Sequence, residues 1–290
     1  MGEKIKTGLV LEGGAMRGIY TAGVLDVFMD HGITFDGVIG VSAGALHGCS
    51  FVSGQKGRSI RYYMKYRSDK HFMSLWNLLR TGDVVGEKFC YHEIPERLDP
   101  YDYEAFLKSK TKFYAVCTNV ETGKAEYLQI TDMRGQVDIM RASASMPYVS
   151  RIVHYKGRKL LDGGCADSIP VEAFRKMGYE KNVVILTRND GYVKKTENPK
   201  LAKAVYRRYP NFVRTLRRRH LVYNHTIEEI HKLEKEGSIF VIRPSVELTI
   251  GRMEKDPEMI HRVYEIGRKD AERQMAELEK WLQDSQNVHQ

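Results

Sequence analysis

The chain begins with short apolar runs separated by glycine turns and helix-like stretches. Residues Gly8 to Leu11 form an apolar run typical of a buried parallel strand. Apolar residues then recur at helical spacing from Tyr20 to Phe28, before Gly32 ends the predicted helix. A second apolar run, Gly37 to Val41, leads into a small-residue helix from Ala43 to about Val52. This order predicts a parallel sheet with helices on its faces.

The rest of the chain alternates between helical and strand-like patterns. The predicted elements are a Tyr-rich helix over 58–80, an irregular stretch of about twenty residues after it, a hairpin of Phe113–Val120 and Ala125–Ile130, a helix over Val137–Ser145, a hairpin over Ile152–Leu161, a helix over Val171–Met177, strands over Asn182–Thr187 and Ser238–Pro244, and a long charged helix from Pro257 to about Leu282. The stretch between Asn189 and Pro199 is the most linker-like part of the sequence and marks the predicted domain boundary. We therefore expect a catalytic domain over residues 1–190 and a carboxyl-terminal extension over 191–290 that packs on it.

Composition narrows the class of protein. With 42% hydrophobic and 29% charged residues, the 290-residue chain resembles an ordinary globular protein. No window approaches the roughly 18 consecutive apolar residues of a membrane span. The apolar run near the amino terminus is too short for a signal-peptide core, so a cytoplasmic location is expected. The four cysteines form no C-x-x-C pair, which argues for reduced thiols and against a metal site.

The basic character of the chain is local. Residues Lys194 to Arg219 hold ten Lys or Arg and one acid, Glu197, and so account for the whole net charge of +9. Apolar residues interleave with these charges, and Pro210 divides the segment in two. Such a segment can lie on the inner face of an anionic membrane, or its apolar stripe can pack on the core. Without a binding motif, nucleic acid is not expected as a partner.

Ser42 lies between Gly40 and Gly44 in the G-x-S-x-G pattern. A serine hydroxyl becomes a nucleophile when a sharp strand-to-helix turn exposes it beside a base and oxyanion donors. The same small residues also suit a tightly packed strand-to-helix joint. Both interpretations fit the motif taken alone.

A glycine turn, Gly13-Gly14-Ala15, ends the first strand as Ser42 ends the second. Consecutive strand-to-helix turns of a parallel sheet meet at its carboxyl edge, so this turn should lie near Ser42 and offer backbone N–H groups to an oxyanion. Phosphate binding is the alternative, but the spacing is neither G-x-G-x-x-G nor a P-loop. Arg17 either anchors the turn or attracts an anionic head group.

A base for Ser42 has two candidate sources. None of the ten histidines follows a predicted active-site turn, and His47 lies five residues past Ser42 on a helix. Asp162 ends an apolar strand and precedes Gly163 and Gly164, which would bring backbone close to its carboxylate. A carboxylate partly removed from water is a stronger base than in solution. Asp-Gly-Gly is also a common turn.

Three blocks in this order resemble the patatin-like phospholipase family: LVLEGGAMRGIYTAGVL, IGVSAGAL and LLDGGCADSIPVEAF. Two lesser blocks, CTNVETGKAEYL and ASASMPYVSRIV, fit the same family. Together they span about residues 7 to 187. The resemblance implies a three-layer α/β/α fold with a mainly parallel sheet, followed here by a helical extension.

The resemblance also implies a chemistry: a serine esterase that hydrolyses acyl esters of phospholipids or related lipids without metal or cofactor. By position, Ser42 would be the nucleophile, Asp162 its base, and Gly13, Gly14 and Ala15 the oxyanion loop, with Arg17, Gly18, Gly40, Gly44, Gly163 and Gly164 supporting these motifs. Ala15 replaces a glycine common in relatives, which matters only if that residue needs a positive φ. The alternative is a basic membrane-docking module with a vestigial site. Substrate identity and oligomeric state stay open.

Overall fold

The alternating pattern produces one mostly parallel sheet. The computed structural model describes residues 5–196 and 198–287, and within them eight strands hydrogen-bond into a single sheet in the order β5-β6-β3-β2-β1-β7-β8, with β4 also paired to β3. The strands are β1 (Thr7–Leu11), β2 (Gly37–Val41), β3 (Lys112–Asn119), β4 (Ala125–Ile130), β5 (Val153–Tyr155), β6 (Arg158–Asp162), β7 (Lys181–Ile185) and β8 (Ile239–Ile242). Pairs within β3-β2-β1-β7-β8 are parallel, whereas β4, β5 and β6 pair in antiparallel fashion.

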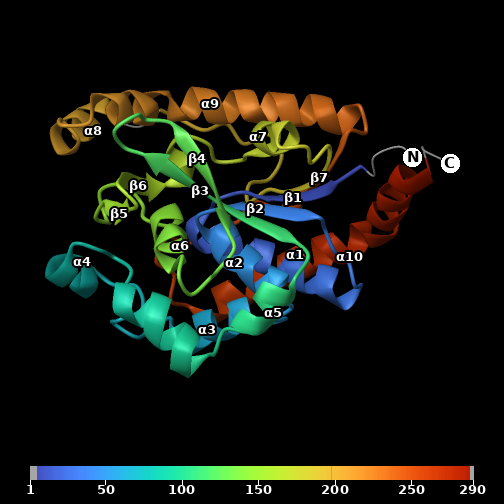
Figure 1. The fold of residues 1–290 in the computed structure, drawn as a ribbon, viewed down its shortest axis with the longest axis horizontal. Helices are drawn as coiled ribbons and strands as arrows, with labels where there is room; N and C mark the ends of the chain where they lie inside the picture. Colours follow the sequence, from blue (N-terminus) through green and yellow to red (C-terminus); the bar gives the residue numbers. More distant parts are fainter. Residues whose placement is uncertain (1–4, 197, 288–290) are drawn as a thin grey trace.

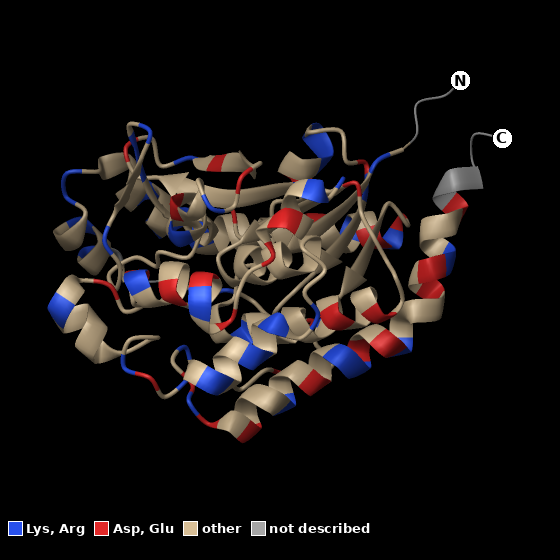
Figure 2. Ribbon diagram, turned by 60° about the horizontal axis from the view of Figure 1, so that its bottom comes forward, with Lys and Arg blue, Asp and Glu red and all other residues tan. Residues whose placement is uncertain are grey.

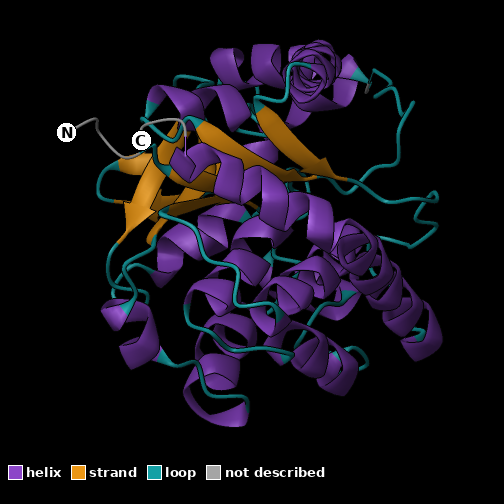
Figure 3. Cartoon of the chain, turned by 90° about the vertical axis from the view of Figure 1, so that its right-hand side faces the viewer, coloured by secondary structure: helices purple, strands orange, loops and turns teal. Residues whose placement is uncertain are grey.

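Helices cover both faces of this sheet, which gives the expected three layers (Figures 1 and 3). The α-helices are α1 (Gly18–Asp30), α2 (Ala43–Val52), α3 (Arg58–Tyr66), α4 (Leu75–Thr81), α5 (Tyr103–Lys108), α6 (Val137–Ser143), α7 (Val171–Lys176), α8 (Pro199–Val205), α9 (Pro210–Lys235) and α10 (Pro257–Asn287). In Figure 1, α7 and α9 lie on one face of the sheet, and α1, α2 and α10 lie on the other.

Alternate residues of the central strands pack into two separate hydrophobic cores, one on each face of the sheet. On β1, Leu9 and Leu11 pack in the cluster beneath α1 and α10, whereas Val10 packs in the cluster beneath α7 and α9. Ile39 and Val41 of β2 join Val10 in that second cluster. Because side chains alternate along a strand, an apolar residue at every position indicates a sheet covered on both faces.

The register of β3 brings two strand ends together. Residues Cys117 and Thr118 of β3 pair with both β4 and β6, so these two strands occupy opposite edges of β3. Since β3 residues 113–116 pair with both β2 and β4, β2 shares the edge that β6 uses. β2 ends at Val41 opposite Val116, and β6 ends at Asp162 opposite Cys117. The two strands therefore meet end to end, which joins the turns that follow them.

The region after α2 differs from the predicted elements. The prediction of a single helix over 58–80 is wrong, because α3 ends at Tyr66 and a separate helix, α4, begins after Ser74. Ser74 caps this second helix: its hydroxyl accepts a hydrogen bond from the Asn77 N–H at 3.0 Å. The irregular stretch predicted next contains a π-helix over Phe89–Leu98. Pro95 lies inside it and lacks an N–H, so the sequence pattern does not indicate a helix there.

The carboxyl-terminal residues contribute a strand and two long helices. β8 extends the sheet beside β7, and α10 packs along α1. Reciprocal hydrogen bonds join these helices, from the Tyr264 hydroxyl to Asp26 (2.6 Å) and from the Tyr20 hydroxyl to Asp270 (3.2 Å). Acidic and basic residues both occur along the length of α10 (Figure 2). Across residues 5–196 and 198–287, no helix combines the length and apolar character needed to cross a bilayer.

Candidate active site

Ser42 stands on a strained turn between β2 and α2, with φ 53° and ψ −122°. The flanking glycines explain how this turn closes. A Cβ on Gly40 would lie 2.5 Å from the Ala45 nitrogen, and one on Gly44 would lie 2.6 Å from the Leu11 oxygen. The glycines therefore serve tight packing, and the same packing holds the serine in a backbone conformation that non-glycine residues rarely adopt. Such strain is typical of functional turns.

Asp162 lies at the end of β6, where its buried carboxyl group is close enough to the Ser42 side chain to interact with it. Its Oδ1 accepts a hydrogen bond from the Gly164 N–H at 2.8 Å. Burial raises the pKa of the Asp162 carboxyl, while the Ser42 hydroxyl and the positive charge of Arg219 oppose that rise. A Cβ on Gly163 would lie 2.3 Å from the Val116 oxygen, so glycine lets this turn press against β3.

Ser143, to which no sequence motif assigned a role, connects the serine turn to the sheet. Its Oγ accepts a hydrogen bond from the Ser42 N–H at 3.0 Å and donates one to the Val116 carbonyl at 2.7 Å. Ser143 is fully buried at the end of α6. Ser143 belongs to the block ASASMP. The small residues of this block were the only feature of the sequence that could have indicated close packing against the serine turn.

The glycine turn after β1 reaches Ser42, as predicted from the topology. A Cβ on Gly13 would lie 3.3 Å from the Cβ of Ser42. The Gly13 N–H donates to the Ser168 carbonyl at 3.4 Å, whereas the Gly14 and Ala15 N–H groups have no protein acceptor among the described residues. Ala15 has a φ of 47°, the conformation that would favour the glycine of relatives. The next residues form a 3-10 turn (Ala15–Arg17) that leads into α1.

Arg17 and Gly18 support the site in different ways. Gly18 begins α1, and a Cβ there would lie 2.6 Å from the Ala43 Cβ, so it allows α1 to approach the serine turn. The Arg17 guanidinium is largely buried, and burial together with the charge of Arg188 lowers its pKa, while Glu12 opposes the shift. Its Nε has no hydrogen-bond partner among the described residues.

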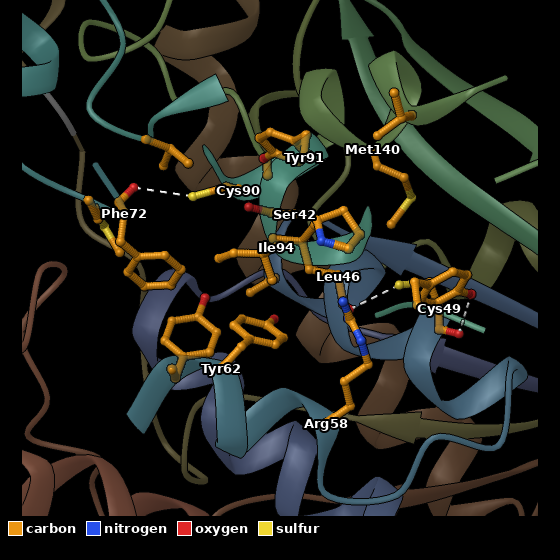
Figure 4. A pocket seen from close by; sticks show the side chains of 18 of the residues that line it. Ser42, Leu46, Cys49, Arg58, Tyr62, Phe72, Cys90, Tyr91, Ile94 and Met140 are labelled. Carbon is orange, nitrogen blue, oxygen red and sulfur yellow. Dashed lines mark hydrogen bonds between the residues drawn. The ribbon is translucent and has the colours of Figure 1, made fainter. Parts of the chain in front are cut away.

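An apolar cavity of about 140 Å³ opens beside Ser42 (Figure 4). Aromatic, aliphatic and sulfur-containing side chains line most of it, among them Leu46, Tyr62, Phe72, Tyr91, Ile94 and Met140. Figure 4 shows the Ser42 hydroxyl between Tyr91 and Ile94. A cavity of this character suits an acyl chain.

No histidine among residues 5–196 and 198–287 lines the cavities that contain Ser42. His47 is buried beneath α1 against Tyr63, with ring centroids 5.9 Å apart. The four cysteines are free thiols, and in the described part of the chain no three His, Cys, Asp or Glu side chains form a metal-binding group.

The basic segment forms α8 and the first half of α9, which Pro210 separates as predicted. Its apolar stripe packs on the core: Tyr206, Phe212 and Leu216 are buried with Leu161 and Cys165. Leu201 and Val205 of α8 face solvent. Arg219 reaches the site, where its Nε donates to the Gly164 carbonyl at 2.6 Å.

Comparison with known proteins gives two family matches and several relatives. The model of the family described as "Patatin-like phospholipase" matches residues 9–175, and one described as "Domain of unknown function (DUF6363)" matches residues 209–283. The "Uncharacterized protein YjjU" of Escherichia coli (strain K12) is 32% identical over 182 residues, 62% of this chain and 51% of that protein.

Two other similar proteins differ more in length. "Lysophospholipase NTE1" of Meyerozyma guilliermondii is 29% identical over 173 residues, 59% of this chain but 12% of that protein. VipD of Legionella pneumophila, a solved structure, has a TM-score of 0.45 and 14% identity, with 93% of this chain and 66% of that one covered. The chain thus spans about half of the first of these curated relatives and about an eighth of the second. Because the first family model matches more than half of its residues, this chain belongs to the patatin-like phospholipase family.

Proposed function

We propose that this protein hydrolyses acyl esters of phospholipids or related lipids, with Ser42 as the nucleophile and Asp162 as its base. The observation that carries this proposal is the meeting of Ser42 and Asp162 where β2 and β6 end on neighbouring residues of β3, beside an apolar cavity. Membership of the patatin-like phospholipase family and similarity to fungal proteins named lysophospholipases support the same class of reaction.

The proposed reaction proceeds in two halves. Ser42 Oγ bonds to the ester carbonyl carbon as Asp162 takes the hydroxyl proton, and the N–H groups of Gly14 and Ala15 stabilise the oxyanion. The bond to the leaving alcohol breaks, and Asp162 returns the proton to that oxygen. Water then attacks the acyl-enzyme, giving its proton to Asp162, and the fatty acid and Ser42 Oγ–H are released. The pKa of Asp162, raised by burial, makes it a stronger base than an exposed aspartate.

We also propose that the protein contacts an anionic membrane surface through α4 and the basic segment. Leu75 and Leu79 of α4 are 65% and 88% exposed, and Trp76 of the same helix has Lys70 and Arg80 over its ring at 5.0 and 5.1 Å. Figure 1 places α4 and α8 at the same end of the molecule. Exposed apolar residues next to cations, with an indole ring among them, suit a headgroup interface.

Labelling with a fluorophosphonate tests the nucleophile. We expect a single adduct, located on Ser42 by mass spectrometry, and none on Ser42→Ala protein. Purified wild-type protein should hydrolyse p-nitrophenyl acyl esters and lipids, and both Ser42→Ala and Asp162→Asn should lose nearly all of this activity while staying folded. Membrane binding without an adduct and without turnover would favour the alternative, a docking module with a vestigial site.

A further inference from the structure

A second cavity, of about 440 Å³, meets the apolar one at Ser42 and has a different character. Ala15, Ser42, Met146 and Arg252 line both cavities. The second cavity is rich in positive charge. We call it the cationic cleft, after the six cationic side chains that line it: Arg17, Arg188, Lys194, Lys195, Arg219 and Arg252.

Contacts within the loop after β7, and between that loop and α9, hold Arg188 and Lys194 in place. The backbone of Lys194 exchanges two hydrogen bonds with the Asn224 side chain of α9, at 2.8 and 3.1 Å. The Lys194 ammonium then lies over the Tyr223 ring at 4.5 Å, and the Arg188 guanidinium lies over the Tyr192 ring at 4.1 Å. These contacts hold positive charges on one side of Ser42.

Acidic groups in the cleft offset only part of this charge. Within residues 5–196 and 198–287, two carboxylates line it, Glu12 and Asp162. Glu12 is buried and accepts hydrogen bonds from the Tyr223 hydroxyl (2.9 Å) and the Thr187 N–H. Asp162 is the proposed base. Gathering six cations around two carboxylates costs electrostatic free energy, and a bound anion would offset that cost.

Most cations of the cationic cleft lie outside the part of the chain that matches the patatin-like family model. The patatin-like model matches residues 9–175, so of the six cations only Arg17 falls within it. Arg219 and Arg252 fall within residues 209–283, the match to the domain of unknown function. The cleft therefore gives these carboxyl-terminal residues a part in the site.

We propose that the cationic cleft binds the phosphate headgroup of an acyl lipid while the acyl chain occupies the apolar cavity, which places the ester at Ser42. This inference rests on the proposed hydrolase function and adds a substrate class: anionic phosphate esters in preference to neutral glycerides. Guanidinium groups suit this role because they bind phosphate oxygens in a bidentate manner. The residues after β7 then determine headgroup preference, and the amino-terminal part performs the chemistry.

The test compares two substrates with the same acyl chain, 1-oleoylglycerol 3-phosphate and 1-oleoylglycerol. Wild-type protein should show a higher kcat/KM for the phosphate ester. Arg188→Gln and Arg252→Gln, which leave the Gly164 and Asp162 contacts intact, should each lower that preference about tenfold, the effect of one charge-assisted hydrogen bond. Arg262→Gln, at an exposed position of α10 outside both the cleft and the basic segment, is the matched control and should keep the wild-type ratio.

Two kinetic results would overturn the headgroup assignment alone: equal kcat/KM for both substrates, or variants that slow both by the same factor. Binding to Ser42→Ala protein separates this assignment from the hydrolase proposal. If wild type hydrolyses neither lipid but Ser42→Ala still binds the phosphate ester more tightly than 1-oleoylglycerol, the hydrolase proposal fails and the headgroup site stands. Equal binding of the two lipids overturns the site, as does inorganic phosphate binding as tightly as the phosphate ester, since a lipid must engage both cavities.

Discussion

The Oγ of Ser143 accepts a hydrogen bond from the backbone N–H of Ser42 at 3.0 Å and passes one to the Val116 carbonyl at 2.7 Å. One buried hydroxyl thereby fixes the strained serine turn to the strand against which Asp162 is also aligned. The position of the proposed nucleophile depends on this contact as well as on its own glycines.

Ser143→Ala should lower both activity and stability. Loss of the hydroxyl leaves the Ser42 N–H and the Val116 carbonyl unpaired in the core, which costs about 1–3 kcal/mol. The shift of the turn should reduce kcat roughly 10-fold or more, because misplacement of a reacting group is costly. Ester hydrolysis and thermal unfolding measure both effects. Ser145→Ala is the control, since its hydroxyl donates to the Arg141 carbonyl of α6 and, among the described residues, to no group of the serine turn. Equal losses in both variants would contradict the role of Ser143.

Ala15→Gly should raise stability. Ala15 adopts a φ of 47°, and a left-handed conformation costs a non-glycine residue about 1–2 kcal/mol. Greater freedom of glycine in the unfolded chain offsets part of the gain. We therefore expect the free energy of unfolding in urea to rise by about 0.5–1 kcal/mol. Ala22→Gly in the middle of α1 should have the opposite sign, and a loss of stability in both variants would argue against strain at Ala15.

Asp162→Asn should be inactive yet more stable than wild type at neutral pH. Burial raises the pKa of Asp162 in the folded state, so above that pKa folding buries a carboxylate that the unfolded chain leaves in water. This cost disappears as pH falls through the folded-state pKa. The Tm advantage of the variant should therefore be largest near neutral pH and shrink in acid, which scanning calorimetry can follow.

The raised pKa of Asp162 also predicts how the activity of the wild-type protein falls as the pH becomes acidic. Because Asp162 must be deprotonated to act as a base, kcat/KM should fall with an apparent pKa above that of an ordinary aspartate. A limb at or below the ordinary value would contradict the buried-base assignment. A limb near 6.5 that disappears with a histidine substitution would identify a histidine as the base.

His47 should make the fold sensitive to acid. Burial lowers the pKa of His47 to about 3, and both ring nitrogens lack a partner among the described residues. Between pH 6.5 and that value the unfolded chain binds a proton that the folded chain does not. Buried His47 therefore does not reduce the free energy of unfolding above pH 6.5. As pH falls below 6.5, that free energy decreases by up to about 1.4 kcal/mol per pH unit.

His47→Leu, which keeps an apolar side chain in this place, should flatten the curve of unfolding free energy between pH 4 and 7. His31 provides a contrast. Hydrogen bonding to Glu272 raises the pKa of His31. The protonated ring therefore stabilises the folded state at low pH, and this stabilisation is lost as pH rises through the folded-state pKa. His31→Gln should therefore lower stability in acid, the reverse of the His47 effect.

Leu79→Glu should weaken binding to anionic liposomes, because Leu79 is the most exposed apolar residue of α4 and a carboxylate there would be repelled by acidic lipids. Cosedimentation with vesicles containing phosphatidylserine measures the loss. Leu107→Glu, at an exposed position of α5 outside the proposed membrane surface, should bind as wild type does. Equal loss in the two variants would indicate a general charge effect in place of an α4 surface.

The sequence by itself determined the elements that carry the site. Short continuous apolar runs, glycines at the turns and helical spacing after them predicted β1, α1, β2 and α2 to within two or three residues, because these patterns reflect local backbone preferences. The hairpin of β5 and β6 was equally local: Lys156 and Gly157 both have positive φ, as its tight turn requires. Family membership followed from motifs of the same local kind.

Only the tertiary structure decided what meets at Ser42. Pairing of β2 and β6 on one edge of β3 brings Asp162 to a serine 120 positions earlier, and register over such separations depends on strand pairing that no local pattern encodes. The Ser143 contact, the apolar cavity and the cationic cleft have the same origin. The basic segment shows the difference most clearly: its charge was evident in the sequence, but packing of Tyr206, Phe212 and Leu216 on the core decides which cations turn toward the site and which face solvent.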